Sequence, residues 1–201
     1  MIRQKQINSS IESVKNAIFN CLPTPTDNLF KLTSVIDQPM LEQLRRYITT
    51  VDLSKWQGVQ QGTLRKVISW DGDTVIEELH LVFEGVTGLI NQQLSDCPLN
   101  FLGLQLWKDS DSYHMGYHID NSIIDVAIQV YLFDSPADSG TVFKIKEEEY
   151  LIPFVHNTGY VSNYVRTTCV PHKVDVHLDS ADSNRYSLYA VWSKSEKIEQ
   201  E

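Results

Sequence analysis

In the first half of the chain, apolar residues recur mainly at the three- and four-residue spacing of amphipathic helices. The segment 11–22 shows this spacing and is followed by Pro23, which ends a helix. A second helix is predicted over 37–50, where Asp37 can act as the N-cap and Pro39 suits the first helical turn. These segments indicate helices that each bury one face.

The segment 71–96 carries a long amphipathic pattern. Its apolar side chains lie along one stripe, which predicts one long helix capped by Asp73 or Thr74. A helix with one apolar face needs a surface to cover, and a sheet is the expected partner. A short strand is also predicted over 29–36. The helical stripe comprises Val75, Leu79, Val82, Phe83, Val86 and Ile90.

From residue 100 onward, the pattern changes to short runs rich in Val, Ile, Tyr and Phe, separated by turn residues. Many short strands joined by such turns are typical of a sandwich or jelly roll. The runs are 100–107, 125–133, 140–145, 158–165, 169–178 and 185–192, with turns at 134–140 and 179–184. The chain is therefore predicted to be one α+β domain, in which 1–99 is a mainly helical support, 100–193 the β core and 194–201 a polar tail.

Composition and charge narrow the function classes. The 201 residues are 42% hydrophobic and 21% charged, as in an ordinary globular protein. No apolar run reaches the roughly 18 residues needed to span a bilayer, and the N-terminus lacks the apolar stretch of a signal peptide, so a cytoplasmic location without a membrane is expected. A net charge of −9, without a cluster of Lys and Arg, disfavours bulk nucleic-acid binding. Cys21, Cys97 and Cys169 show no CxxC spacing and indicate reduced thiols.

The segment 114–120, HMGYHID, contains a candidate metal site. On a strand, His118 and Asp120 would point to the same face. Two histidines and one carboxylate on one face are the ligand set of non-haem iron, so a second histidine is needed from a distant strand. Two candidates follow: His172 shares its strand face with Val174 and Val176, whereas His177 shares its face with polar residues. The apolar face is the buried one, which favours His172 and leaves His177 as a solvated histidine.

Arg185 and Ser187 again lie two positions apart on a predicted strand. A guanidinium that points into a sandwich interior is costly unless a carboxylate meets it, and Arg binds carboxylates through paired hydrogen bonds. No acidic residue is an obvious internal partner by sequence, so a bound dicarboxylate is the expected one. Arg65 is predicted to be a solvated strand arginine, and Trp107 a core residue.

The order His118-x-Asp120, His172, Arg185-x-Ser187 resembles the signature of the iron(II)/2-oxoglutarate-dependent dioxygenase superfamily. The resemblance covers roughly residues 100 to 193 and extends loosely over 32–48, which looks like the entry of the small prolyl-hydroxylase-like members. It implies a double-stranded β-helix, that is, a jelly roll, with the N-terminal helices packed against one sheet. Gly140 and Thr141 match the family's structural turn before a core strand.

The resemblance also implies roles for individual residues. His118, Asp120 and His172 would hold Fe(II), while Arg185, assisted by Ser187, would bind the far carboxylate of 2-oxoglutarate. The Tyr-x-x-Gly spacing that prolyl hydroxylases carry upstream of HxD is missing here, and Tyr113 or Gln105 are the candidates for the remaining contacts. With O2, such an enzyme hydroxylates its substrate and releases succinate and CO2.

The substrate implied by the resemblance is an unidentified peptide or small molecule, and the oligomeric state is open. Halogenating relatives replace the carboxylate by a small residue, so the presence of Asp120 favours hydroxylation. Two other readings stay open. One is a non-catalytic jelly-roll module that binds a sugar or peptide, and the other is a cupin-like enzyme that uses another metal without a keto acid.

Overall fold

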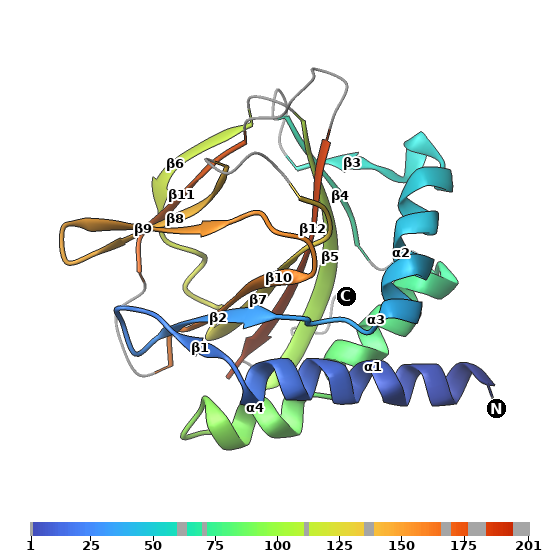
Figure 1. The fold of residues 1–201 in the computed structure, drawn as a ribbon, viewed down its shortest axis with the longest axis horizontal. Helices are drawn as coiled ribbons and strands as arrows, with labels where there is room; N and C mark the ends of the chain where they lie inside the picture. The colour runs from blue at the N-terminus through green and yellow to red at the C-terminus, as the bar shows by residue number, and fades with distance from the viewer. Residues whose placement is uncertain are drawn as a thin grey trace.

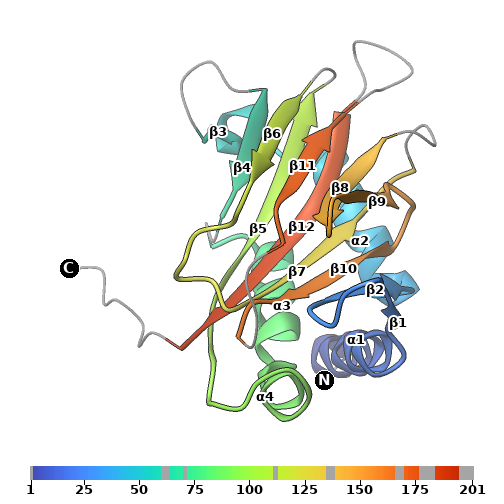
Figure 2. The same ribbon diagram turned by 90° about the vertical axis from the view of Figure 1, so that its left-hand side faces the viewer.

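The computed structural model describes residues 2–59, 64–69, 72–110, 113–134, 139–165, 170–176 and 184–194. Two antiparallel sheets lie face to face, and the helices cover the outer side of the larger one (Figure 1). Figure 2 shows the same molecule with the smaller sheet in front of the larger one. The predicted turns at 134–140 and 179–184, together with Cys169 and His177, lie wholly or largely outside the described residues.

The larger sheet has the strand order β1-β2-β10-β7-β12-β5-β4-β3 and the smaller sheet the order β6-β11-β8-β9. From β5 to β12 the chain passes repeatedly between the two sheets, which is the winding of a double-stranded β-helix. The predicted jelly roll with helices against one sheet is therefore confirmed. The strands of the larger sheet are β1 (Leu22–Pro23), β2 (Leu29–Thr33), β10 (Thr158–Asn163), β7 (Val126–Tyr131), β12 (Asn184–Ser193), β5 (Asn100–Ser110), β4 (Arg65–Ile68) and β3 (Gln57–Gly58). Those of the smaller sheet are β6 (His114–His118), β11 (His172–Asp175), β8 (Gly140–Ile145) and β9 (Glu148–Pro153).

Four α-helices and one 3-10 turn are found in the described part of the chain. They are α1 (Ile2–Phe19), α2 (Gln38–Thr50), the 3-10 turn Leu53–Lys55, α3 (Thr74–Glu84) and α4 (Thr87–Gln93). Helix α1 contacts α2 and α3, and α3 contacts β5 of the larger sheet (Figure 1). The apolar stripes of these helices bury against the outer face of that sheet, as the amphipathic patterns predicted.

The two faces of the larger sheet differ in chemistry because side chains alternate along each strand. On β12, Leu188 and Ala190 face the helices and join the main apolar core. Arg185, Ser187 and Tyr189 alternate with them and are also buried, on the face toward the smaller sheet. The interior between the sheets thus holds polar and aromatic side chains in a place where a plain sandwich would hold aliphatic ones.

The structure corrects three details of the predicted elements. The long helix predicted over 71–96 is two helices, with a break at Gly85 and Val86. A side chain at Gly85 would lie 2.7 Å from Ile11 of α1, so the break lies where Ile11 packs against the chain. Asp73 caps α3 as predicted, but the Asp37 carboxylate makes no capping bond and instead accepts a 2.6 Å hydrogen bond from Ser10. Strand β9, in the charged run after residue 147, was missed. The single-domain organisation stays a prediction.

Candidate metal centre and buried charge cluster

Three side chains from two distant segments meet at one end of the smaller sheet. In the register of β6 and β11, His118 and His172 are direct cross-strand partners, and their ring centroids lie 4.3 Å apart. Asp120 Oδ1 lies 3.9 Å from His118 Nε2 and 3.6 Å from His172 Nε2. One ligand atom from each of the three residues therefore lies within 4.8 Å of the others. This set of two imidazoles and one carboxylate matches the donors that ferrous iron accepts.

The orientation of Asp120 does not come from strand alternation. Strand β6 ends at His118, so Asp120 lies two residues beyond it, and the same-face argument from the sequence does not apply. Two tyrosine hydroxyls position the carboxylate instead: Tyr189 and Tyr164 donate to Oδ2 at 3.1 and 3.3 Å. Burial is the largest cause that raises the pKa of Tyr189 well above its usual value, and the charge of Asp120 is the next. This hydroxyl therefore keeps its proton and remains a donor. Oδ1 is left directed at the imidazoles.

Each histidine has its Nδ1 atom beside a backbone carbonyl. The Nδ1 atom of His118 lies 2.9 Å from the carbonyl oxygen of Gly116, and that of His172 lies 3.4 Å from the carbonyl of Val170. A carbonyl oxygen only accepts, so Nδ1 carries a proton and Nε2, which lies toward Asp120, is the nitrogen that can bind a metal. Burial is the main cause that lowers the pKa of His172, partly offset by the charge of Asp120. The neutral imidazole is therefore favoured, which is the form that binds a metal.

A second group of buried charges lies in one row across β4, β5 and β12. Arg65 and Arg185 are both cross-strand partners of Asp109. Arg65 donates to the two carboxylate oxygens of Asp109 at 2.6 and 3.0 Å, and Arg185 donates through Nη2 to the same carboxylate. All three side chains are buried: Arg65 is 6% exposed, Arg185 1% and Asp109 0%. We call them the charge cluster.

The charge cluster corrects two expectations. Arg185 does have an internal acidic partner, because Asp109 is brought beside it by strand pairing, and Arg65 is buried rather than solvated. One carboxylate nevertheless does not satisfy Arg185, whose Nε and Nη1 atoms are buried without a hydrogen-bond partner. Burial and the nearby Arg65 lower the pKa of Arg185, which expresses the cost of a second guanidinium in this place. These two unpaired nitrogen atoms are available as donors to an added carboxylate.

The other residues expected to contact the co-substrate lie in different environments. Ser187 is fully buried and accepts a 3.1 Å hydrogen bond from Gln129, so its own hydroxyl proton can be donated elsewhere. Tyr113 packs in the interior apolar cluster, and its buried hydroxyl has no hydrogen-bond partner. Gln105 is exposed, and its side-chain oxygen accepts a 2.8 Å bond from Trp107. The structure thus buries Ser187 and Tyr113 and leaves Gln105 exposed.

Sequence reasoning missed Asp109, Tyr164 and Tyr189. Tyr189 had a detectable signal, because it continues the two-residue alternation of Arg185 and Ser187 on the same strand face. Asp109 had none, since only the register of three strands reveals that it lies between two arginines.

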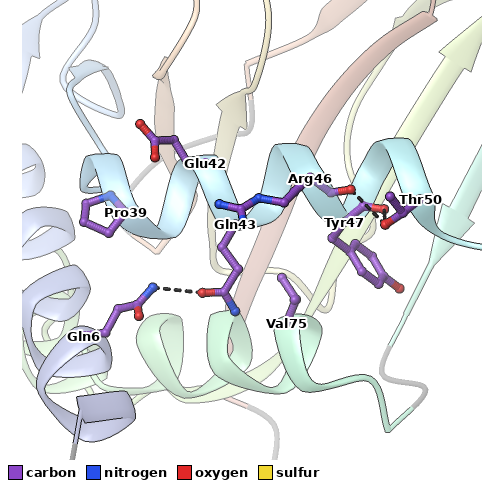
Figure 3. Close-up of a pocket in the computed structure, with 8 residues that line it drawn as sticks. All are labelled: Gln6, Pro39, Glu42, Gln43, Arg46, Tyr47, Thr50 and Val75. Carbon is purple, nitrogen blue, oxygen red and sulfur yellow. Dashed lines mark hydrogen bonds between the residues drawn. The ribbon is translucent and has the colours of Figure 1, made fainter.

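Two surface grooves differ in their relation to the metal centre. One, of about 570 Å3, lies beside α2 among the helices and is lined by residues such as Gln6, Gln43 and Arg46 (Figure 3). It shares no residue with the metal centre. The other, of about 650 Å3, is lined in part by Ile119, Val170 and Pro171. Ile119 lies between His118 and Asp120 in sequence, and Pro171 directly precedes His172, so this groove borders the segments that carry all three donors.

Comparison with known proteins supports the fold at low sequence identity. A prolyl-4-hydroxylase of Pseudomonas putida is similar with a TM-score of 0.66 and 14% identity, over 92% of this chain and 100% of that one. A prolyl hydroxylase of Trichoplax adhaerens in complex with a hypoxia-inducible-factor peptide fragment has a TM-score of 0.64 and 13% identity, over 94% and 91%. HygX of Streptomyces hygroscopicus, with nickel, 2-oxoglutarate and hygromycin B bound, has a TM-score of 0.59 and 12% identity, over 83% and 82%. No protein-family model and no curated protein sequence matches.

These similarities show that the chain has the fold of the 2-oxoglutarate-Fe(II) oxygenases, as the resemblance in the sequence implied. The similar structures include one with a peptide fragment and one with hygromycin B bound. Among the described residues, no helix is both long and apolar enough to cross a bilayer.

Proposed function

We propose that this protein is an Fe(II)- and 2-oxoglutarate-dependent dioxygenase that hydroxylates a peptide or small molecule and releases succinate and CO2. The observation that carries the proposal is the convergence of His118, Asp120 and His172 within 4.8 Å, inside a fold shared with enzymes of this class. The donors suit iron in number and type. Fe(II) held by them would supply open coordination positions at which a keto acid and O2 react.

The chain's own residues would prepare this centre. The hydroxyls of Tyr164 and Tyr189 hold one oxygen of Asp120 and thereby turn the other toward the histidines. The carbonyl oxygens beside Nδ1 fix the tautomer of each imidazole. This arrangement needs little reorganisation when a metal binds, and preorganisation of this kind is what protein ligands contribute to a metal site.

The co-substrate carboxylate would bind at the charge cluster. The unpaired Nε and Nη1 of Arg185 are buried donors that an added carboxylate could accept from. The hydroxyl of Ser187, which accepts from Gln129, would donate to a carboxylate oxygen. Tyr113 offers a further unpaired hydroxyl in the same interior. A dicarboxylate that reaches from Arg185 to the metal would satisfy groups that are otherwise buried without partners.

The test has a binding step and a turnover step. Purified protein is mixed without oxygen with Fe(II) and 2-oxoglutarate, and the metal-to-ligand charge-transfer absorption is recorded. Oxygen is then admitted, and succinate is measured with peptide and small-molecule substrate mixtures. We expect the absorption band and succinate in the wild type, and neither in His172→Ala or Asp120→Ala.

Failure of both signals in the wild type would refute the proposal. A non-catalytic binding module, the second reading of the sequence, would instead keep its sugar or peptide affinity after treatment with a chelator. The measurement of ligand affinity before and after EDTA treatment separates the two functions.

A further inference from the structure

Three buried polar side chains form a row across β10, β7 and β12 of the larger sheet. Tyr160 and Gln129 are cross-strand partners, and Ser187 lies on the next strand, diagonally across from Gln129. All three are at most 2% exposed. The Tyr160 hydroxyl donates to Gln129 Oε1 at 2.6 Å, and Gln129 Nε2 donates to Ser187 Oγ at 3.1 Å. We call these three residues the hydrogen-bond chain.

The direction of the hydrogen-bond chain is set at Tyr160. Burial is the largest cause that raises the pKa of Tyr160 well above its usual value, and the neighbouring Tyr131 is the next, so the phenol keeps its proton. A buried O–H group needs an acceptor, so the side-chain oxygen of Gln129 must face Tyr160. The NH2 group of Gln129 then faces Ser187, and an NH2 group only donates.

The consequence appears at the other end of the chain. Because Ser187 Oγ accepts from Gln129, the hydroxyl proton of Ser187 must point elsewhere. Among the described residues, the bond from Gln129 is the one hydrogen bond that the Ser187 side chain makes. The chain thus ends in a buried O–H donor two positions along β12 from Arg185, on the same face of the sheet. Such a donor fits a ligand atom that only accepts, as a carboxylate oxygen does.

Tyr160 controls this donor without touching it. The oxygen and nitrogen ends of a glutamine amide have nearly the same shape, so only their hydrogen bonds distinguish them. Without the Tyr160 hydroxyl, the amide of Gln129 can turn its oxygen toward Ser187 and accept the serine proton. A ligand carboxylate would then have to break that bond before Ser187 could donate to it.

We propose that Tyr160 and Gln129 are positioning residues for the co-substrate: they fix the direction of the hydrogen-bond chain and thereby hold Ser187 as a donor to a ligand carboxylate. This inference rests on the proposed function for the identity of the ligand, 2-oxoglutarate. It adds two residues from β10 and β7, both outside the Arg185-x-Ser187 motif, to the machinery that binds the ligand.

The experiment measures the dissociation constant of 2-oxoglutarate by calorimetry on protein loaded with Mn(II) in place of iron, so that no turnover occurs. Tyr160→Phe should weaken binding roughly 3- to 10-fold, the size of one neutral hydrogen bond that the ligand must first break. The effect should vanish in a Ser187→Ala background, because no serine proton is left to redirect. Loss of packing at Tyr160 would instead weaken binding equally in both backgrounds.

A rescue variant makes the test sharper. In Tyr160→Phe/Gln129→Met the amide is absent, so nothing in the hydrogen-bond chain captures the Ser187 proton. Affinity should therefore return to within about twofold of the wild type, although two buried polar groups have been removed. A purely structural role would make the double variant bind at least as weakly as Tyr160→Phe.

Tyr186→Phe is the matched control, since Tyr186 lies beside Ser187 on β12 but packs with Trp56 and Phe133 on the opposite face of the sheet. It should bind 2-oxoglutarate like the wild type. If Tyr160→Phe does not fold, Gln129→Glu takes its place, because a carboxylate accepts from both Tyr160 and Ser187. Its charge acts in either background, so it should cost more affinity with Ser187 present than in Ser187→Ala.

The outcomes separate the inference from the proposed function. If the wild type binds 2-oxoglutarate and Tyr160→Phe binds it equally well, or loses the same affinity in both backgrounds, the inference is wrong while the proposed function stands. An equal cost of Gln129→Glu in both backgrounds has the same meaning. If the loss depends on Ser187 and the double variant recovers, but no succinate forms under any condition, the inference stands and the catalytic proposal fails. If the wild type binds no 2-oxoglutarate, both are refuted.

Discussion

Removal of the Tyr189 hydroxyl tests how the carboxylate of Asp120 is oriented in the candidate metal centre. Tyr189→Phe removes one of the two donors to Asp120 Oδ2, a bond of 3.1 Å, and leaves Tyr164 as the other donor. The ring of Tyr189 stacks on Trp107 with centroids 4.3 Å apart, and phenylalanine preserves that contact. The variant therefore changes the orientation of the carboxylate with little change in packing.

The size of the effect follows from the environment of Asp120. A hydrogen bond to a charged group contributes about 1.5–3 kcal/mol. The side chain of Asp120 is 15% exposed, so water can partly replace the lost donor, and the lower value of about 1.5 kcal/mol is expected. This corresponds to roughly a tenfold weaker metal affinity, in line with the loss of an outer hydrogen bond at other metal sites.

The assay is anaerobic calorimetry with Mn(II) on the wild type, Tyr189→Phe and Tyr186→Phe. Tyr186 is the matched control because it lies on the same strand but packs with Trp56 and Phe133 on the opposite face of the sheet. We expect Tyr186→Phe to bind like the wild type. Asp120→Ala should lose Mn(II) binding. If it does and Tyr189→Phe still binds Mn(II) within twofold of the wild type, the Tyr189 hydroxyl does not position the carboxylate.

The other predictions concern ligand binding, pH and packing. Arg185→Met should weaken 2-oxoglutarate binding by at least about tenfold, since it removes charge-assisted hydrogen bonds. Unchanged affinity in calorimetry would contradict this binding site. Saturating Mn(II), at about 100 times its dissociation constant, should stabilise the fold by about 2.7 kcal/mol and raise Tm by roughly 5–10 °C, and EDTA should reverse this shift in a thermal melt. Because the folded state lowers the pKa of His172 below 6.5, the unfolded chain binds the extra proton more readily, so the metal-free protein should lose stability as the pH falls below about 6.5. The free energy of unfolding, measured with urea at pH 7.5 and at pH 5.5, should differ less between the two pH values in His172→Gln than in the wild type. An equal difference in both proteins would reject this cause. Gly159→Ala places a methyl group against the backbone of Gln129 and should cost about 1–3 kcal/mol in urea unfolding, whereas Gly116→Ala, with open space around it, should cost less.

Much of the fold was predictable from periodicity. The helices at 37–50 and 71–96 and the strands after residue 100 follow from apolar spacing, because burial of one face imposes that spacing on any chain. The break at Gly85 escaped prediction, since the stripe continues across it and only the contact with Ile11 of α1 marks the position. Strand β9 escaped because its charged residues hide the alternation.

The metal centre was also partly predictable. The choice of His172 over His177 needed only the two-residue alternation of a strand, and the structure places His172 beside His118 and Asp120. The reason offered for Asp120 was wrong, because this residue lies beyond the end of β6 and owes its orientation to Tyr164 and Tyr189.

The amino-acid sequence by itself determined the class of fold and the residues that can carry metal and carboxylate chemistry, because both depend on local spacing along one strand or helix. Only the tertiary structure decided which charges meet. Asp109 lies 44 residues from Arg65 and 76 from Arg185 in the chain, and all three become neighbours through the register of β4, β5 and β12. Electrostatic energy depends on distance in space and on exclusion of water, and neither quantity is encoded in the spacing of residues along the chain.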